Sequence, residues 1–469
     1  MVPMALHGGM PRQTPSKRHC VAAGVTVILR APPNRQPLMP KASAPYCAID
    51  FGTSNSAVAV PNGDSQIQLV PVEGSALAMP TAVFYSAEDG SRLFGRAAVQ
   101  AYVDGYEGRL MRSIKSILGS DLMDRTTEVG LGVSVKYIDV VIAYLRELKH
   151  QAELHVGADI ARVVIGRPVF FVDGDNARDK LAQQTLASAA QAVGFTDVIF
   201  QYEPIAAALD FEQSVNKETL VLVADIGGGT SDFSVVRVGP AQRTKTERAS
   251  DILANHGVHV AGTDFDREVN VAAIMPKLGL GSATRAKLGN ATSGPSRVPS
   301  ATYFDLATWH LINTVYTPNR IIELRHMASM FADSMLHRRL MTVVEKRLGH
   351  ELAAKAEGAK IDVAQTGIAE IDLSAVEESL SAHFDADQQR AALATEMARI
   401  VAAAKETLRL AGLEPNAIGA LYFTGGSTGF GALTDAIAAV VPAANRVTGD
   451  RFSSVVSGLG IHASRHFAV

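Results

Sequence analysis

Two short glycine-containing segments of this 469-residue chain carry the residue types needed to bind a polyphosphate. Each has an apolar run ending in an aspartate, then glycines with Thr, Ser or Asn, then a second apolar run. The first reads CAIDFGTSNSAVAV, with Asp50, and the second reads LVLVADIGGGTSDFSVVRV, with Asp225. Glycine lets a ligand approach the backbone, turn N–H groups can bind an anion, and a nearby aspartate suits Mg²⁺. Two copies predict two related lobes that bind one polyphosphate, as in a nucleotide-binding and nucleotide-hydrolysing protein.

A third glycine corner follows the apolar run at residues 420–424. It reads GGSTG and precedes a helical pattern. A helix behind such a corner would direct its positive N-terminus at a ligand. Alone the corner predicts only a turn, but as the third of its kind it is a candidate part of the same site.

Other nucleotide motifs are absent from the sequence. It contains no G-x-x-x-x-G-K-[ST] and no G-x-G-x-x-G opening a helix after the first strand. A Walker-type P-loop and a dinucleotide fold are therefore not expected. His256 and His259 form an H-x-x-H that no further ligands complete, so we expect no zinc site.

Composition and charge narrow the class of protein. The net charge of −3 offers no global argument for nucleic acid or an acidic membrane surface as partner. No apolar stretch is long enough for a transmembrane helix. Cys20 and Cys47 are the two cysteines, which excludes a disulfide framework and fits a reducing compartment. We therefore expect a cytoplasmic protein with no nucleic-acid partner and no membrane span.

Residues 1–45 differ from the rest of the chain. They are rich in proline and contain Lys and Arg but no Asp or Glu. The apolar run at residues 21–29 follows two basic residues, as in a signal peptide, but no A-x-A-like site comes after it. We therefore expect a disordered extension rather than a secretory leader.

After Tyr46, strand and helix patterns alternate, which predicts an α/β architecture. Strands are expected at residues 67–72, 82–85, 162–165, 198–201, 368–373 and 420–424. Helices are expected at residues 92–102, 108–118, 137–155, 178–193, 388–411, 432–440 and 455–467, with another opening at Pro204 and a long helical tract over 319–360. The glycine- and proline-rich stretch at 276–300 is predicted to be a mobile loop or linker.

The order of five motifs resembles the actin-like ATPase superfamily. They are IDFGTSNS, YEPIAAALDFE, DIGGGTSDFS, HVAGTDFD and FTGGSTGF. More closely, the chain from Tyr46 onward resembles the nucleotide-binding domain of DnaK-type heat-shock chaperones. Within that group VVIGRPVFF, VIFQYEPIAAALDFE and FSSVVSGLGIHA are most similar to the YegD-like chaperones.

This resemblance implies an actin-like ATPase fold, with two lobes that each contain a ribonuclease-H-like mixed sheet flanked by helices. Lobe I would cover residues 46–218 and lobe II residues 219–469, with a helical, variable subdomain at about 266–415.

The resemblance also implies roles for individual residues. The two phosphate loops would be formed by Gly52, Thr53, Ser54 and Asn55, and by Gly227, Gly228, Gly229 and Thr230. Asp50 and Asp225 would hold Mg²⁺ and its waters. Lys115 in RLMRSIKSILG reads alone as part of a solvated basic face, and Glu203 before Pro204 as a helix N-terminal acid. By resemblance both are catalytic, together with Asp225 and Thr230, while Pro168 and Arg178 resemble a relay that couples nucleotide state to lobe motion.

Adenosine contacts carry over from the family less completely. Glu357 and Lys360 match an E-x-x-K motif of the adenosine helix, although alone they read as a surface pair. Further matches to nucleotide-binding positions are Gly262, Gly425, Gly426 and Ser427. Ile361 and Gly429 stand where the family usually has two arginines that sandwich the base. Losing them removes cation–π stacking, so we expect altered affinity or base selectivity.

The resulting prediction is a slow ATPase that converts ATP and water to ADP and phosphate, with ATP, ADP and Mg²⁺ as its ligands. Residues 455–467 match the closing helix of the ATPase unit, so we expect a nucleotide-binding domain without a peptide-binding domain. It would act as a chaperone or as a nucleotide-dependent switch for an unknown protein partner, with no peptide client. The alternatives are an actin-like filament protein of the cell-shape type and a kinase on the same fold. Residues 115–119 and the YegD-like segments favour the ATPase.

Overall fold

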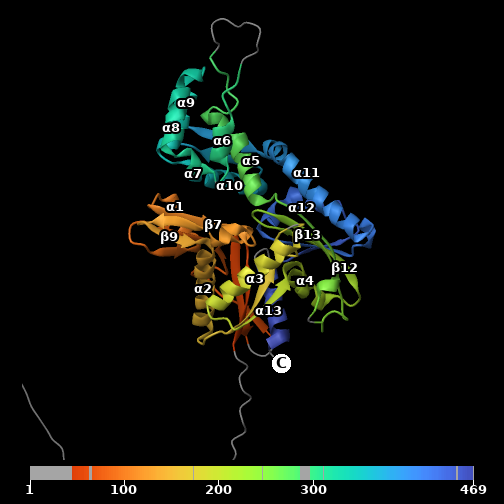
Figure 1. Cartoon of the computed structure of the whole chain (residues 1–469). Helices are drawn as coiled ribbons and strands as arrows, with labels where there is room; N and C mark the ends of the chain where they lie inside the picture. The colour runs from red at the N-terminus through yellow and green to blue at the C-terminus, as the bar shows by residue number, and fades with distance from the viewer. Residues whose placement is uncertain are drawn as a thin grey trace, which may run out of the picture. The chain divides into compact units, whose positions relative to one another are not determined.

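The computed structural model describes residues 45–62, 66–172, 174–245, 247–285, 296–309, 311–449 and 453–467. The predicted extension at 1–45 lies outside these residues apart from Pro45, and so does the middle of the stretch at 276–300. Within the described part, two mixed sheets are flanked by helices (Figure 1). None of the described helices combines the length and the apolar character needed to cross a membrane.

The first sheet has the strand order β11-β10-β1-β2-β3, and β4 also pairs with β2. Its strands are β1 (Tyr46–Phe51), β2 (Asn55–Asn62), β3 (Gln66–Leu69), β4 (Ala78–Pro80), β10 (Arg162–Arg167) and β11 (Asp197–Tyr202). β1 pairs in parallel with β10 and antiparallel with β2. Their apolar, β-branched runs suit central strands that helices cover.

The second sheet repeats this plan in the order β14-β13-β12-β17-β18. Its strands are β12 (Thr219–Ile226), β13 (Ser231–Val238), β14 (Ile252–Val258), β17 (Ala420–Thr424) and β18 (Asn445–Thr448). β12 pairs antiparallel with β13 and in parallel with β17. The repeat in the sequence is therefore a repeat in the structure, since β1–β2 and β12–β13 are both central hairpins with a parallel strand on the other side.

Helices cover these sheets, and their ends follow local sequence signals. The principal ones are α2 (Tyr137–Val156), α3 (Asn176–Ala192), α4 (Glu203–Ser214), α5 (Gly262–Val269), α10 (Gly349–Thr366), α11 (Ala386–Ala411), α12 (Gly431–Ala438) and α13 (Ser454–Phe467). A capping box of Asp385 and Gln388 opens α11, and Gly412 at φ +64° closes it. Both devices pair backbone groups that a helix end otherwise leaves unsatisfied.

The last helix of the chain packs against the first sheet. α13 contacts β1, β2, β3 and β10, and it crosses α4 closely. A Cβ atom added at Gly458 would lie 1.9 Å from the carbonyl oxygen of Ala206, so the crossing requires glycine at this position. The lobe boundaries predicted at 218 and 219 stay predictions.

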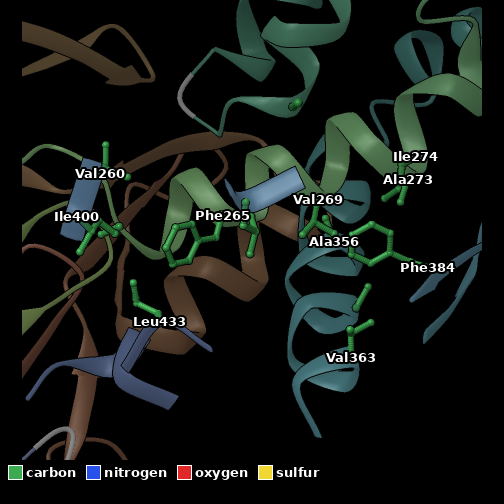
Figure 2. Packing of buried hydrophobic residues seen from close by; sticks show 14 of the residues in the cluster. Val260, Phe265, Val269, Ala273, Ile274, Ala356, Val363, Phe384, Ile400 and Leu433 are labelled. Carbon is green, nitrogen blue, oxygen red and sulfur yellow. The ribbon is translucent and has the colours of Figure 1, made fainter. Parts of the chain in front are cut away.

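α5 is the centre of a second core in the region between β14 and β17. Figure 2 shows Val269 of α5 beside Ala356 of α10 and Phe384 of β16 (Ser381–Asp385), whereas Phe265 of α5 lies nearer Leu433 of α12. All five side chains are buried, and burial of such apolar surface contributes roughly 25 cal/mol per Å². This packing holds the beginning of α5 beside the second glycine hairpin.

One helix expected from the sequence is wrong, and another begins later. The expected helix at 108–118 is instead the strand β7 (Gly108–Arg112) and a 3₁₀ turn (Ile114–Ile117). β7 pairs antiparallel with β5 (Ala82–Ser86), so pairing between distant segments outweighs local propensity. The helix expected at 92–102 begins only at Gly95, as α1 (Gly95–Val103), after the strand β6 (Arg92–Phe94).

The long helical tract expected at 319–360 is interrupted. It consists of α8 (Pro318–His326), α9 (Ser334–Glu345) and α10, with a 3₁₀ turn after α8. Asp333 caps the start of α9 by accepting a bond from the Met335 N–H. Arg347 has φ +55° and separates α9 from α10, because a residue in the left-handed conformation cannot continue a right-handed helix.

Candidate functional site

The first glycine hairpin is a tight turn braced from behind. Thr81 donates its hydroxyl to the Gly52 carbonyl at 2.8 Å, and its backbone N–H bonds to the Ser54 carbonyl at 2.8 Å. A Cβ atom added at Gly52 would lie 2.1 Å from the Asn55 carbonyl oxygen. The turn between β1 and β2 therefore requires glycine for steric reasons and is held in one conformation.

The second hairpin is held through its carbonyl groups. The Gly227 carbonyl accepts the Ser427 hydroxyl at 2.7 Å and the Gly262 N–H at 3.3 Å. The Gly228 carbonyl accepts the N–H and the hydroxyl of Thr263 at 2.8 and 2.7 Å. The start of α5 and the third glycine corner thus fix this loop from the carbonyl side. Of the predicted nucleotide residues, Gly262 and Ser427 lie at this junction.

The three glycine corners meet in space. A Cβ atom added at Gly228 would lie 2.0 Å from the Ser54 hydroxyl oxygen, so the two hairpins touch. Gly425 has φ +89°, and its Cβ would lie 2.4 Å from the Ile226 carbonyl oxygen and 2.7 Å from Oδ1 of Asp225. The tertiary structure brings these segments together from three distant parts of the sequence.

Lys115 lies in a buried acidic centre beside these corners. Its Nζ atom is 2.8 Å from Oε1 of Glu203, and the two side chains are 9% and 12% exposed. Burial lowers the pKa of Lys115, but Glu203, Asp50 and Asp225 outweigh that effect and raise it. The solvated-face interpretation of Lys115 does not fit this burial, and the ammonium group stays charged.

Both aspartates of the repeat are strongly perturbed. Burial, and to a smaller extent repulsion from Glu203, raises the pKa of Asp50 to about 7. For Asp225, burial is again the largest cause, and repulsion from Glu203, Asp232 and Asp50 adds to it. Together they raise the pKa of Asp225 to about 8. Glu203, Asp50 and Asp225 therefore share the charge of Lys115, and Asp232 adds a further negative charge beside Asp225. Such a centre favours an added cation or bound protons.

Asp232 is a member of this centre that sequence reasoning did not single out. It stands opposite Asp225 in the register of β12 and β13. The corresponding position opposite Asp50 is Ala57. The signal was present in the sequence, because Asp232 ends the motif DIGGGTSD and the hairpin pattern places it across from Asp225.

The donor set fits Mg²⁺, although it is not a preformed cage. In the part of the chain that the structure describes, no three Asp, Glu, His or Cys side chains are grouped as metal ligands. Mg²⁺ is usually held by one or two carboxylates, with waters and substrate phosphates as the remaining ligands. Asp50 and Asp225 can supply that number of carboxylates.

A small cavity lies beside Glu203 and Asp225. Its volume is about 20 Å³, and Pro168, Pro204 and Asp232 also line it. Arg178 has different partners, since its Nε atom donates to the Gly119 carbonyl at 3.1 Å. The structure thus places Pro168 next to the acidic centre and Arg178 next to the segment that follows Lys115.

The predicted adenosine residues lie on α10, next to α5. Lys360 forms an ion pair with Asp266 at 2.6 Å. Burial raises the pKa of Asp266 to about 6, against the effect of Lys360 and with that of Glu357. Ile361, where the family usually has an arginine, leaves 43% of its surface exposed.

Comparison with known proteins finds sequence similarity to one family. Residues 46–274 match the family model described as "Hsp70 protein". The chain is 31% identical over 223 residues to the chaperone protein DnaK of Thermosipho melanesiensis and 30% identical over 223 residues to that of Thermosipho africanus. It is 29% identical over 223 residues to that of Thermotoga petrophila. In each case 47% of this chain is matched, and it covers 34% of the relative, about a third of its length.

The fold class predicted from the sequence is confirmed. The structure is α/β, with mixed sheets flanked by helices, and the Hsp70 match implies the actin-like ATPase fold. The match covers the first sheet, both glycine hairpins, Lys115, Glu203 and the start of α5. The family-model match and the DnaK relatives together show that about half of this chain is similar to the Hsp70 family.

Proposed function

We propose that this chain binds ATP and ADP with Mg²⁺ at the meeting point of the glycine corners and slowly hydrolyses ATP. The observation that carries the proposal is the position of Lys115. It pairs with Glu203 at 2.8 Å and interacts with Asp50 of the first hairpin and Asp225 of the second. A buried lysine shared by two phosphate-type turns suits the transfer of a phosphoryl group.

Asp50 and Asp225 would hold the Mg²⁺ ion through carboxylate oxygens and waters. The ion would supply positive charge that neutralises the phosphate oxygens. It would also relieve the mutual repulsion that, with burial, raises the pKa of both aspartates. Nucleotide binding is therefore expected to depend on the metal.

The chain's own groups then divide the remaining work. N–H groups of the two glycine turns bind phosphate oxygens, except that of Gly227, which donates to the Thr230 carbonyl at 3.0 Å. Thr230 adds its hydroxyl. Lys115 donates to the γ-phosphate, orients the attacking water and stabilises the charge that develops. The water oxygen bonds to Pγ as the bond to the β–γ bridging oxygen breaks, and a neighbouring carboxylate accepts the water's proton. Glu203 keeps Lys115 in position.

The biological role that we propose follows the relatives, each named a chaperone protein. The chain would act as a chaperone of the YegD-like type or as a nucleotide-dependent switch for a protein partner, without a peptide client. The cavity shared by Pro168, Glu203 and Asp225 supports this proposal, because it lies where a change at the metal would meet the start of α4.

Titration calorimetry and phosphate release test the enzymatic proposal. We expect micromolar or tighter ATP and ADP binding that EDTA abolishes, and slow phosphate release without any added acceptor. Absence of binding heat with both nucleotides, with and without Mg²⁺, would refute the proposal. Phosphate transfer that requires a small-molecule acceptor would indicate the kinase alternative, and ATP-dependent sedimentation would indicate the filament alternative.

A labelled unfolded peptide tests the expected lack of a peptide client. We expect no saturable binding in either the ATP or the ADP state and no stimulation of ATP turnover. Saturable micromolar binding in either state would contradict the proposal that this chain works through another protein.

A further inference from the structure

Four side chains from distant parts of the sequence form what we call the cross-lobe cluster: Tyr102, Arg112, Trp309 and His350. Tyr102 lies on α1 and Arg112 ends β7, whereas Trp309 follows α6 (Ala301–Ala307) and His350 is in the first turn of α10. α1, β7, α6 and α10 are labelled in Figure 1. The cluster therefore joins the segment beside the first sheet to the helices inserted between β14 and β17.

The contacts within the cluster are specific. The Tyr102 hydroxyl is 3.2 Å from Nε2 of His350, and their rings meet edge to face at 4.5 Å. The Arg112 guanidinium lies 4.7 Å from the centre of the Trp309 ring. The Trp309 and His350 rings also meet edge to face, at 4.7 Å. Tyr102 and Arg112, from the first part of the chain, thus contact His350 and Trp309 of the helical region.

His350 suits a neutral role in this cluster. Only 6% of its surface is exposed. Burial lowers its pKa to about 4 against the opposing effect of a hydrogen bond with the Trp309 backbone, and the charge of Arg112 acts in the same direction as burial. A neutral imidazole keeps one ring nitrogen as an acceptor, and the Tyr102 hydroxyl is placed to donate to it.

The cluster adjoins the predicted nucleotide residues on both sides. Arg112 is three residues before Lys115 in the chain. Burial lowers the pKa of Arg112, and Glu357 and Asp266 oppose that effect through their charges. Glu357 is two helical turns after His350 on α10, so both lie on one face of that helix. A movement that separates the two parts of the cluster would move Lys115 away from α10.

We propose that the cross-lobe cluster is a clasp that retains bound nucleotide, with Arg112 as its main positioning residue. The proposal rests on the nucleotide binding proposed above. Opening the site requires the Arg112 guanidinium to leave Trp309 and the Tyr102 hydroxyl to leave His350. The clasp contributes to the barrier for nucleotide release and not to the bond-breaking step, because its members act through the position of the lobes.

Stopped-flow release of a fluorescent ADP analogue from the full chain tests the clasp. We expect Arg112→Ala to speed release about tenfold, equivalent to ~1.4 kcal/mol, which is within the range for a partly desolvated cation–π contact. Arg112→Lys should have a smaller effect, because an ammonium cannot stack as a planar guanidinium does. Tyr102→Phe should speed release about threefold, and Arg146→Ala, at an exposed arginine of α2, should not change it.

Two further readouts separate the clasp from general loss of structure. Single-turnover hydrolysis at saturating ATP should stay within about twofold of wild type in Arg112→Ala. Trp309 is the only tryptophan of the chain, so acrylamide quenching reports this contact directly and should increase in Arg112→Ala. If wild type binds the analogue and Arg112→Ala releases it at the wild-type rate, the clasp is overturned while nucleotide binding stands. If wild type binds no nucleotide, both proposals fail.

Discussion

The two glycine hairpins begin alike but differ in their second strands and in the tightness of their turns. Each places an aspartate seven residues before a register partner, but that partner is Ala57 for Asp50 and Asp232 for Asp225. The first turn is sterically tight at Gly52, whereas a Cβ atom added at Gly229 of the second would meet nothing within 4 Å. The first turn is therefore packed more tightly against its own backbone, and the second hairpin carries more charge.

This difference indicates that the two repeated hairpins have different roles in the site. Thr81 braces the first hairpin through backbone groups, which suits a fixed phosphate-binding turn. The second hairpin has an additional carboxylate, Asp232, which suits a cation site. It is held by hydrogen bonds from α5 and from the third glycine corner. Substitutions in and around the two hairpins can test this division.

The largest effect is expected for Lys115, the cation that both hairpins share. Lys115→Ala should slow single-turnover ATP hydrolysis by roughly a hundredfold or more while nucleotide binding persists, because it removes a transition-state contact. Lys180→Ala, at an exposed lysine of α3, is the control and should leave the rate unchanged. An unchanged rate in Lys115→Ala would remove Lys115 from the catalytic set.

Asp50 and Asp225 should differ in how much Mg²⁺-dependent ATP binding is lost when each is replaced by asparagine. Asp50→Asn should weaken Mg²⁺-dependent ATP binding by about a hundredfold, because no second carboxylate stands opposite it. Asp225→Asn should weaken it by about tenfold, since Asp232 can partly substitute, and the double variant with Asp232→Asn should match Asp50→Asn. These values correspond to ~2.8 and ~1.4 kcal/mol, and calorimetry at fixed Mg²⁺ measures them. Equal losses in the two single variants would contradict the contrast between the hairpins.

The tightness of the two turns can be compared by adding one methyl group to each. Gly52→Ala should lower the free energy of unfolding by about 1–3 kcal/mol, the range for steric overpacking, because its Cβ meets the Asn55 carbonyl at 2.1 Å. Gly229→Ala should change stability by less than about 0.5 kcal/mol, as expected for a substitution that meets no neighbour. Denaturant melts of both variants measure the difference, and similar losses would show that the turns are equally constrained.

The last prediction concerns pH. The pKa of Asp50 is raised to about 7 and that of Asp225 to about 8, whereas an unfolded aspartate titrates near pKa ~3.9. The folded chain therefore binds protons that the unfolded chain has released, so this contribution to stability is present below pH ~4 and is lost as pH rises toward about 8. Melting temperature in EDTA should fall between pH 5.5 and 8.5, and less steeply in Asp225→Asn. A wild-type melting temperature that does not change with pH would contradict the raised pKa values of Asp50 and Asp225 in the folded chain.

Local patterns in the sequence determined much of the fold. The paired motifs at Asp50 and Asp225 predicted two hairpins, and both are present as β1–β2 and β12–β13. The apolar spacing at 137–155 predicted α2, which runs over Tyr137–Val156. These predictions succeed because glycine turns, helix caps and apolar periodicity act over a few residues. The same local patterns misassigned β7, whose partner strand β5 lies far from it in the sequence.

Only the tertiary structure decided how the site residues meet. Lys115 read alone is part of a surface face, and its burial against Glu203 depends on the packing of two distant segments. Asp232 gains its importance from the strand register that sets it opposite Asp225. Arg112 and Trp309 carry no shared sequence signal, and their contact exists because β7 and the helical region come together in the folded chain. Burial and charge coupling are properties of neighbours in space, which a linear sequence encodes only through the complete fold.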